Sequence, residues 1–91
     1  MPAARVLLVS PADLAGSEQA VRAARAMRDT GAEVVLLPDA PIAAIVAAAM
    51  QEAVDTVYCQ GPRIAELTAA MQSEEMDVVV ATTESAGRRE P

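Results

Sequence analysis

The single cysteine, Cys59, has the most reactive side chain in this sequence, and it ends a short apolar run at residues 55–59. A thiol at such a position could serve as a nucleophile or as a soft metal ligand. A nucleophile needs a neighbouring base and a metal needs further ligands, but the chain has no histidine and no second cysteine. The residue types therefore favour a buried structural thiol over a catalytic or metal-binding one, and they exclude an internal disulfide.

Other polar side chains follow the remaining apolar runs without forming a recognisable catalytic group. A loop at residues 11–17 follows the first run, and Thr82 and Thr83 follow the last. Gly16 stands alone, so the loop lacks the glycine-rich pattern that cradles phosphate. Scattered acids such as Asp13 and Asp39 are normally solvated rather than bound to a cation. No nucleophile and base are grouped, so we expect no catalysis by this chain alone and no resident metal.

The elements that must position these side chains alternate regularly. Continuous apolar runs favour strands that are covered on both faces, and they lie at residues 5–10, 32–38, 55–59 and 76–82. Between them lie segments with apolar residues at helical spacing, at residues 17–30, at about 41–53 and after Gly61. Gly31 follows the first of these, where a helix commonly ends. The order β-α-β-α-β-α-β predicts an α/β fold with a doubly wound parallel sheet.

Composition limits the partners. The formal net charge is -6, which argues against a general nucleic-acid binder. No apolar stretch is long enough for a transmembrane helix or a signal peptide, so we expect no membrane partner and a cytoplasmic location. We assign residues 1–83 to one domain and residues 84–91, which lack an apolar period, to a disordered C-terminal tail.

Residues 5–83 resemble the cobalamin-binding domain of the methylmalonyl-CoA mutase type. The best-matched stretches are "RVLLVSP", "AVRAARAMRDTGAEVVLLP" and "IAAIVAAAMQEAVDTVYCQ". The resemblance implies a flavodoxin-like fold with sheet order 2-1-3-4-5. The chain stops before the fifth strand of that pattern, so we expect order 2-1-3-4, truncated before a fifth strand.

The functional residues of that family have no direct counterparts here. The family's first loop carries Asp-x-His-x-x-Gly, whereas this chain reads "ADLAGSEQ", with Asp13 at or beside the Asp and Gly16 nearest the His. The Ser pair after the third strand and the Gly pair after the fourth are also replaced. The resemblance implies these cofactor-binding candidates: Ser10, Asp13, Gly16, Ser17, Gln60, Gly61, Thr82 and Thr83.

The fourth predicted strand suggests how the chain meets a partner. In order 2-1-3-4 the strand at residues 76–82, from Met76 to Thr82, lies at an edge of the sheet. Its apolar side chains and unpaired backbone groups would form a template for pairing with another chain. We therefore expect a homodimer or a complex with a larger partner through this edge.

Two hypotheses about function follow. The first is a non-catalytic assembly or regulatory module, a relative of cobalamin-binding domains that pairs with itself or with a larger partner such as an acyl-CoA mutase. The alternative is a cobalamin-binding subunit that holds the cofactor base-on, or with a partner's histidine, for an adenosylcobalamin-dependent mutase or a methyl transfer. Cobalamin is thus a possible cofactor and no other is expected.

Overall fold

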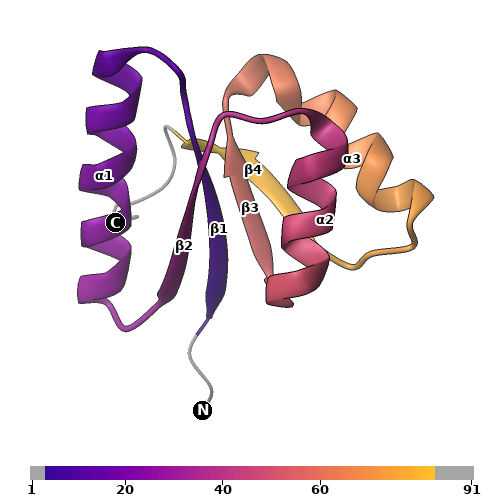
Figure 1. Cartoon of the computed structure of the whole chain (residues 1–91). Helices are drawn as coiled ribbons and strands as arrows, with labels where there is room; N and C mark the ends of the chain where they lie inside the picture. The colour runs from indigo at the N-terminus through magenta and orange to yellow at the C-terminus, as the bar shows by residue number, and fades with distance from the viewer. Residues whose placement is uncertain (1–3, 84–91) are drawn as a thin grey trace.

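The chain folds as alternating strands and helices around one sheet (Figure 1). The structure, a computed structural model, describes residues 4–83, so the predicted tail at 84–91 lies outside the described residues. The elements are β1 (Arg5–Ser10), α1 (Leu14–Asp29), β2 (Glu33–Pro38), α2 (Ile42–Glu52), β3 (Thr56–Cys59), the 3-10 turn η1 (Gly61–Arg63), α3 (Ile64–Ser73) and β4 (Val79–Thr82).

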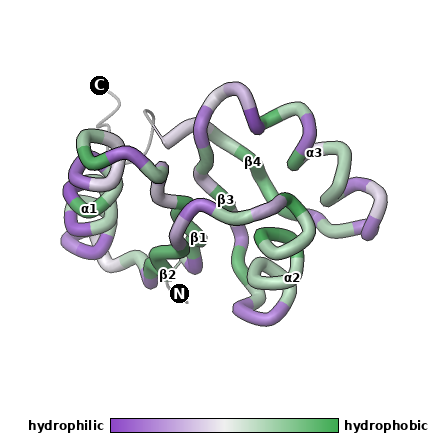
Figure 2. Tube along the Cα trace, turned by 45° about the horizontal axis from the view of Figure 1, so that its top comes forward, coloured by the Kyte–Doolittle hydropathy of each residue, from purple (hydrophilic) through white to green (hydrophobic). Residues whose placement is uncertain are grey.

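The four strands form one parallel sheet in the order β2-β1-β3-β4. This confirms the predicted α/β class and the predicted strand order, which are consistent with a flavodoxin-like fold. The helices cover both faces, with α1 on one side and α2 and α3 on the other (Figure 2).

Alternate residues of each strand supply the two halves of the core. In β1, Leu7 belongs to the cluster under α2 and α3, whereas Leu8 belongs to the cluster under α1, and both are 0% exposed. A strand buried on both faces needs apolar residues at every position, which explains why β1 reads as a continuous apolar run. The core on the α1 side is built largely from small residues, because α1 contributes Ala20, Ala23 and Ala24 beside Met27.

Helix α1 begins earlier than the spacing predicts, at Leu14 rather than at residue 17. Asp13 is its N-cap, and a carboxylate oxygen of Asp13 accepts a hydrogen bond of 2.8 Å from the backbone N–H of Gly16. Such a cap satisfies one of the unpaired N–H groups of the first turn and stabilises a helix by about 1 kcal/mol. The loop after β1 is therefore shorter than expected. At the other end Gly31 has φ +98°, a conformation that favours glycine.

Strand β4 is shorter than the predicted strand, because it begins at Val79 rather than at Met76. Glu75 has φ 57°, and the backbone N–H of Met76 donates to the carbonyl of Met71, so the chain is still leaving α3 at that point. The prediction of a strand over the whole of residues 76–82 was wrong at its start. Met76 and Val78 instead pack against the core beside α3.

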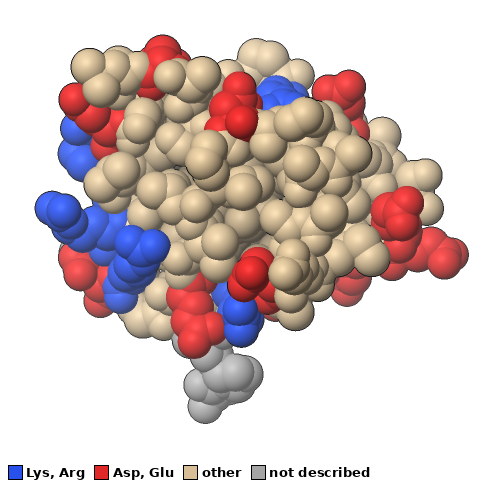
Figure 3. Space-filling model, viewed as in Figure 1, with Lys and Arg blue, Asp and Glu red and all other residues tan. Residues whose placement is uncertain are grey.

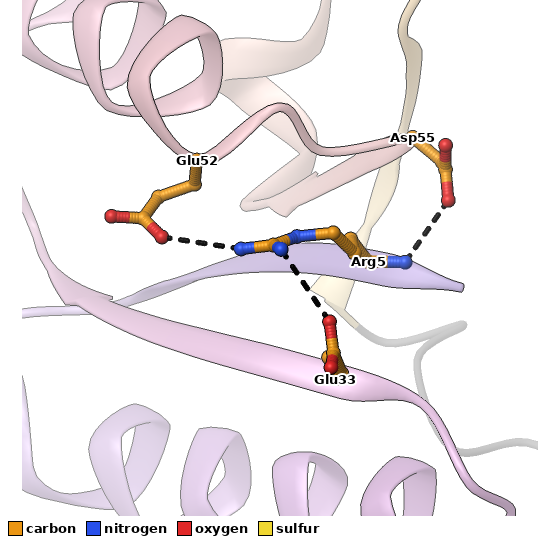
Figure 4. Close-up of polar contacts among 4 residues, drawn as sticks. All are labelled: Arg5, Glu33, Glu52 and Asp55. Atoms are coloured by element: carbon orange, nitrogen blue, oxygen red, sulfur yellow. Dashed lines mark hydrogen bonds and ion pairs between the residues drawn. The ribbon is translucent and has the colours of Figure 1, made fainter. Parts of the chain in front are cut away.

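At the amino end of the sheet, Arg5 joins three neighbouring segments (Figure 4). Its backbone N–H donates to Asp55, which precedes β3, at 2.9 Å. Its guanidinium lies 3.6 Å from Glu33 in β2 and 3.5 Å from Glu52 in α2. These ion pairs are exposed, so each is worth at most about 1 kcal/mol. Together with the hydrogen bond from the N–H of Arg5, these ion pairs hold the start of β1 to the start of β2, the end of α2 and the turn before β3.

Within residues 4–83, no helix is both long and apolar enough to cross a membrane.

Candidate functional site

The candidate site is a cavity of about 430 Å³ at the carboxyl ends of β1, β3 and β4. The chain leaves β1 toward β2 on one side, whereas β3 lies on the other side of β1, so the strand order reverses at this point. Ligands of open α/β sheets bind in the crevice that such a reversal creates. The cavity is lined by Pro11, Asp13, Ala15, Gly16, Gln19, Gln60, Gly61, Pro62, Thr82 and Thr83.

Most of the residues singled out in the sequence lie together in this cavity. They come from three separate segments, and they are Asp13, Gly16, Gln60, Gly61, Thr82 and Thr83. Ser10 and Ser17 do not line it. They lie in a different hollow of about 420 Å³, beside Leu36, Pro38 and Asp39. The Ser10 hydroxyl is buried and donates to the carbonyl of Pro11 at 3.3 Å, a local contact within the loop.

The sequence reasoning did not select the remaining lining residues. Pro11, Ala15 and Pro62 form the apolar part of the wall, and Gln19 adds a side-chain amide from the second turn of α1. The early start of α1 is part of the reason: once Asp13 is recognised as the cap, Ala15 lies in the first turn of the helix rather than in the loop. Gln19 was already expected on the helix, and no sequence signal indicated that it lines the cavity.

Gly16 allows the first turn of α1 to approach the loop closely. A Cβ atom at this position would lie 2.7 Å from Cβ and 2.8 Å from Cγ of Pro11. Such distances are shorter than van der Waals contact, so any larger residue would displace the loop from the helix. Gly16 is thus needed for the packing of the cavity wall.

We predict that Gly16→Ala destabilises the protein by roughly 1–2 kcal/mol, because an overpacking cost of up to about 3 kcal/mol exceeds the gain of about 1 kcal/mol in helix propensity. Gly61→Ala is the matched control in the same cavity, since a Cβ there meets no atom within 4 Å. The control should change the free energy of unfolding by less than about 0.5 kcal/mol. Urea unfolding of both variants measures the difference, and equal stability would contradict this account of Gly16.

Thr83 directly follows β4 and lines the cavity, and its hydroxyl is buried. The residue is 7% exposed, and among the described residues its Oγ1 has no hydrogen-bond partner. A buried hydroxyl left without a partner costs about 1–3 kcal/mol. Proteins retain few such groups, so the hydroxyl of Thr83 calls for an explanation.

Cys59 lies behind the cavity rather than in it. Its side chain is 0% exposed and belongs to the core cluster under α2 and α3. Burial raises the pKa of the Cys59 thiol above its ordinary value, and the nearby positive charge of Arg63 opposes the rise. Arg63 itself pairs with Asp39 at 2.7 Å. The expected buried structural thiol is therefore what the structure contains, and a thiolate nucleophile is disfavoured.

The raised pKa of Cys59 predicts a loss of stability at alkaline pH. The unfolded chain releases the thiol proton near the ordinary pKa of 9.0, whereas the folded chain retains it to higher pH. The contribution of the Cys59 thiol to the free energy of unfolding is therefore fully present below pH 9.0. It falls as pH rises further, by at most about 1.4 kcal/mol per pH unit. Urea unfolding from neutral to alkaline pH should show this slope in the wild type and not in Cys59→Ala. The same slope in both proteins would refute it.

The charge around the cavity is negative. Among the described residues that line it, Asp13 is acidic and none is basic. Most of the basic side chains visible in Figure 3 gather instead over α1. In residues 4–83, no group of three or more histidine, cysteine, aspartate or glutamate side chains is placed to hold a metal ion.

Comparisons with known proteins add little to this picture. No protein-family model and no curated protein sequence matches the chain. Among solved structures, the chain is similar to a crystal structure of DOX-P reductoisomerase in complex with magnesium, with 12% sequence identity and a TM-score of 0.49. The similarity covers 89% of this chain and 20% of that chain, so this chain spans about a fifth of that protein's length.

Proposed function

We propose that this chain is a non-catalytic assembly module that pairs with a second copy of itself through the outer edge of β4. The observation that carries the proposal is the difference between the two outer strands, β2 and β4, which are the two edges of the sheet. An open edge of a parallel sheet carries backbone groups that another strand can satisfy.

The β2 edge is protected. The guanidinium of Arg28 donates to the carbonyl of Val34 at 2.9 Å and so occupies a backbone acceptor of this strand. Pro38 ends β2 and has no N–H to donate, and Glu33 begins the strand with a charge. Charged residues, proline and covering side chains are the features by which proteins prevent pairing at an edge.

The β4 edge has none of these features within the strand, whose sequence is Val-Val-Ala-Thr. Val79 is 62% exposed although it is apolar. By the strand register Val79 lies beside Thr56, on the same face of the sheet as α1. Helix α1 packs mainly on β1 and β2, so it leaves Val79 uncovered. An isologous pairing of β4 with β4 of a second copy would extend the sheet and cover this apolar surface.

The same geometry supports a binding role rather than catalysis. Cys59 is buried with a raised pKa, and the carboxylate of Asp13 is engaged as a helix cap. The described cavity wall thus lacks a base beside a nucleophile. A larger partner such as an acyl-CoA mutase would use the same edge.

We predict that Val79→Lys abolishes self-association. Lysine at an edge strand adds charge where two copies would meet, while an exposed position leaves the monomer's stability nearly unchanged. Leu36→Lys is the matched control, because Leu36 is 38% exposed on the protected β2 edge. Light scattering across a concentration series should give a dimer for the wild type and for Leu36→Lys, and a monomer for Val79→Lys.

A monomeric wild type at high concentration would refute pairing between copies. A dimer that persists in Val79→Lys and dissociates in Leu36→Lys would place the interface on the wrong edge and refute the assignment to β4.

A cobalamin-binding subunit is the second candidate, favoured by the convergence of the loops after β1 and β3 and the end of β4 on one cavity. The residues present do not fit a cobalamin held through an axial imidazole. The chain has no histidine, and at Gly16 the contact with Pro11 leaves no room for a side chain. This candidate therefore requires the base-on form or a partner's histidine.

Gel filtration after mixing with hydroxocobalamin decides between the two candidates. The assembly module predicts a protein peak without the visible spectrum of cobalamin and an unchanged melting temperature. Cobalamin in the protein peak would support the second candidate, and saturation at 100 times Kd would then add about 2.7 kcal/mol of stability.

A further inference from the structure

We infer that two copies of the chain join β4 to β4 in antiparallel orientation about a two-fold axis at Val80, where the two Val80 residues exchange both of their backbone hydrogen bonds. The inference rests on the proposed pairing of copies through β4 and specifies its geometry. It also distinguishes a second copy from a larger partner that would add a fifth strand parallel to β4. It is carried by the direction of one backbone hydrogen bond, by the strand register and by the uncharged flank of α3.

The backbone of β4 shows which of its groups face outward. The N–H of Val79 donates to the carbonyl of Asp55, which precedes β3, at 3.1 Å, so the backbone groups of Val79 face β3. Along a strand the N–H and C=O of one residue point to one side, and those of the next residue point to the other. Those of Ala81 therefore face β3 as well, whereas the N–H and C=O of Val80 point toward the open edge. Within residues 4–83, no strand lies beyond β4.

Symmetry between identical chains selects antiparallel pairing. A two-fold axis along the strands would keep both strands in one direction, with Val80 level with Val80 of the second copy. The N–H groups of these two residues would then face one another and could not bond. A two-fold axis perpendicular to the sheet reverses the second strand, so that each N–H faces a C=O. The perpendicular axis gives a closed isologous pair, the commonest arrangement of two identical chains.

Two registers place most of β4 opposite its copy, one centred on Val80 and the other on Ala81. With the axis at Val80, the exposed apolar side chain of Val79 lies opposite Ala81 of the second copy and is covered. With the axis at Ala81, Val79 would lie opposite Thr83, which is beyond the end of β4. The central hydrogen bonds would then also run through Thr82, which already makes another interaction. The register centred on Val80 is favoured, because its two central bonds involve Val80 alone.

The face of the sheet that carries α3 permits this arrangement. Helix α3 packs on β4, so the perpendicular axis brings α3 of the two copies to one side of the joined sheet. Ala70 lines the hollow that α3 shares with α2, so the opposite flank of α3 carries Ala65, Thr68 and Gln72. None of these is charged, although each copy has a formal net charge of -6. The two Asp77 residues, which precede β4, would lie at opposite ends of the paired strands.

The test is a disulfide scan of the full chain with one added cysteine at a time, at Val79, Val80 or Ala81, in a buffer of oxidised and reduced glutathione. Facing residues of a hydrogen-bonded antiparallel pair have Cα atoms about 5.5 Å apart, within the usual disulfide range of about 4.4–6.8 Å. With the axis at Val80, residue 79 or 81 is displaced from its own copy by about 7 Å along the strands, beyond that range once the strand spacing is added.

We expect Val80→Cys to form the covalent dimer at least about tenfold faster than Val79→Cys and Ala81→Cys, because of this difference in distance. The wild type in the same buffer is the control, since its single cysteine, Cys59, is 0% exposed and should form no covalent dimer.

Amide hydrogen exchange in the wild type gives a second readout that needs no substitution. The N–H of Val79 is bonded to Asp55 within one chain, whereas the N–H of Val80 gains its bond from the second copy. Exchange at Val80 should therefore slow by at least about tenfold from dilute to concentrated protein. Val79→Lys, which is expected to remain a monomer, should show no such change.

The outcomes separate this geometry from the proposed function. A wild type that stays monomeric, with no concentration dependence of exchange at Val80, would refute pairing through β4 and the geometry together. A dimer in which Ala81→Cys is cross-linked faster than Val80→Cys would overturn the register and leave pairing through β4 intact. A dimer in which none of the three variants is cross-linked faster than the wild type would overturn the antiparallel arrangement.

Discussion

The burial of β1 on both faces is the constraint on which the rest of the structure depends. Leu7 and Leu8 point to opposite sides of the sheet and are both 0% exposed, so helices must cover both faces. With β2 on one side of β1 and β3 on the other, the crossover from β1 to β2 and the crossover from β2 to β3 run in opposite directions across the sheet. That divergence opens the cavity at the carboxyl ends of the strands, so the site is a consequence of how the core is buried.

The two ends of the sheet differ in what holds them. At the amino end, Arg5 ties β1 to Glu33, Glu52 and Asp55 by exposed contacts of modest strength. At the carboxyl end, the close approach of Gly16 to Pro11 and the cap at Asp13 define the wall. The wall is therefore shaped by backbone packing rather than by long side chains. One added methyl group at Gly16 would therefore disturb the wall. Few side chains of the described wall carry groups that could take part in catalysis.

The sequence predicted the fold better than it predicted the details of the site. Continuous apolar runs and helical spacing sufficed for the α/β class with a parallel sheet, because both reflect burial, whereas the strand order came from the family resemblance. Parallel strands bring their carboxyl ends to one edge. The start of α1 was missed because the cap at Asp13 depends on loop geometry. The start of β4 was missed because Met76 is apolar for packing beside α3 rather than for pairing. The separation of Ser10 from the cavity and the burial of Thr83 depend on side-chain directions that no periodicity encodes.

Strand β4 takes part in both the proposed interface and the cavity. Its outer edge would pair with a second copy, and Thr82 at its end, followed by Thr83, lines the cavity. Among the described residues β4 pairs with β3, so pairing with a second copy would extend the sheet beyond its last described strand. An interface formed in this way would lie directly beside the cavity wall.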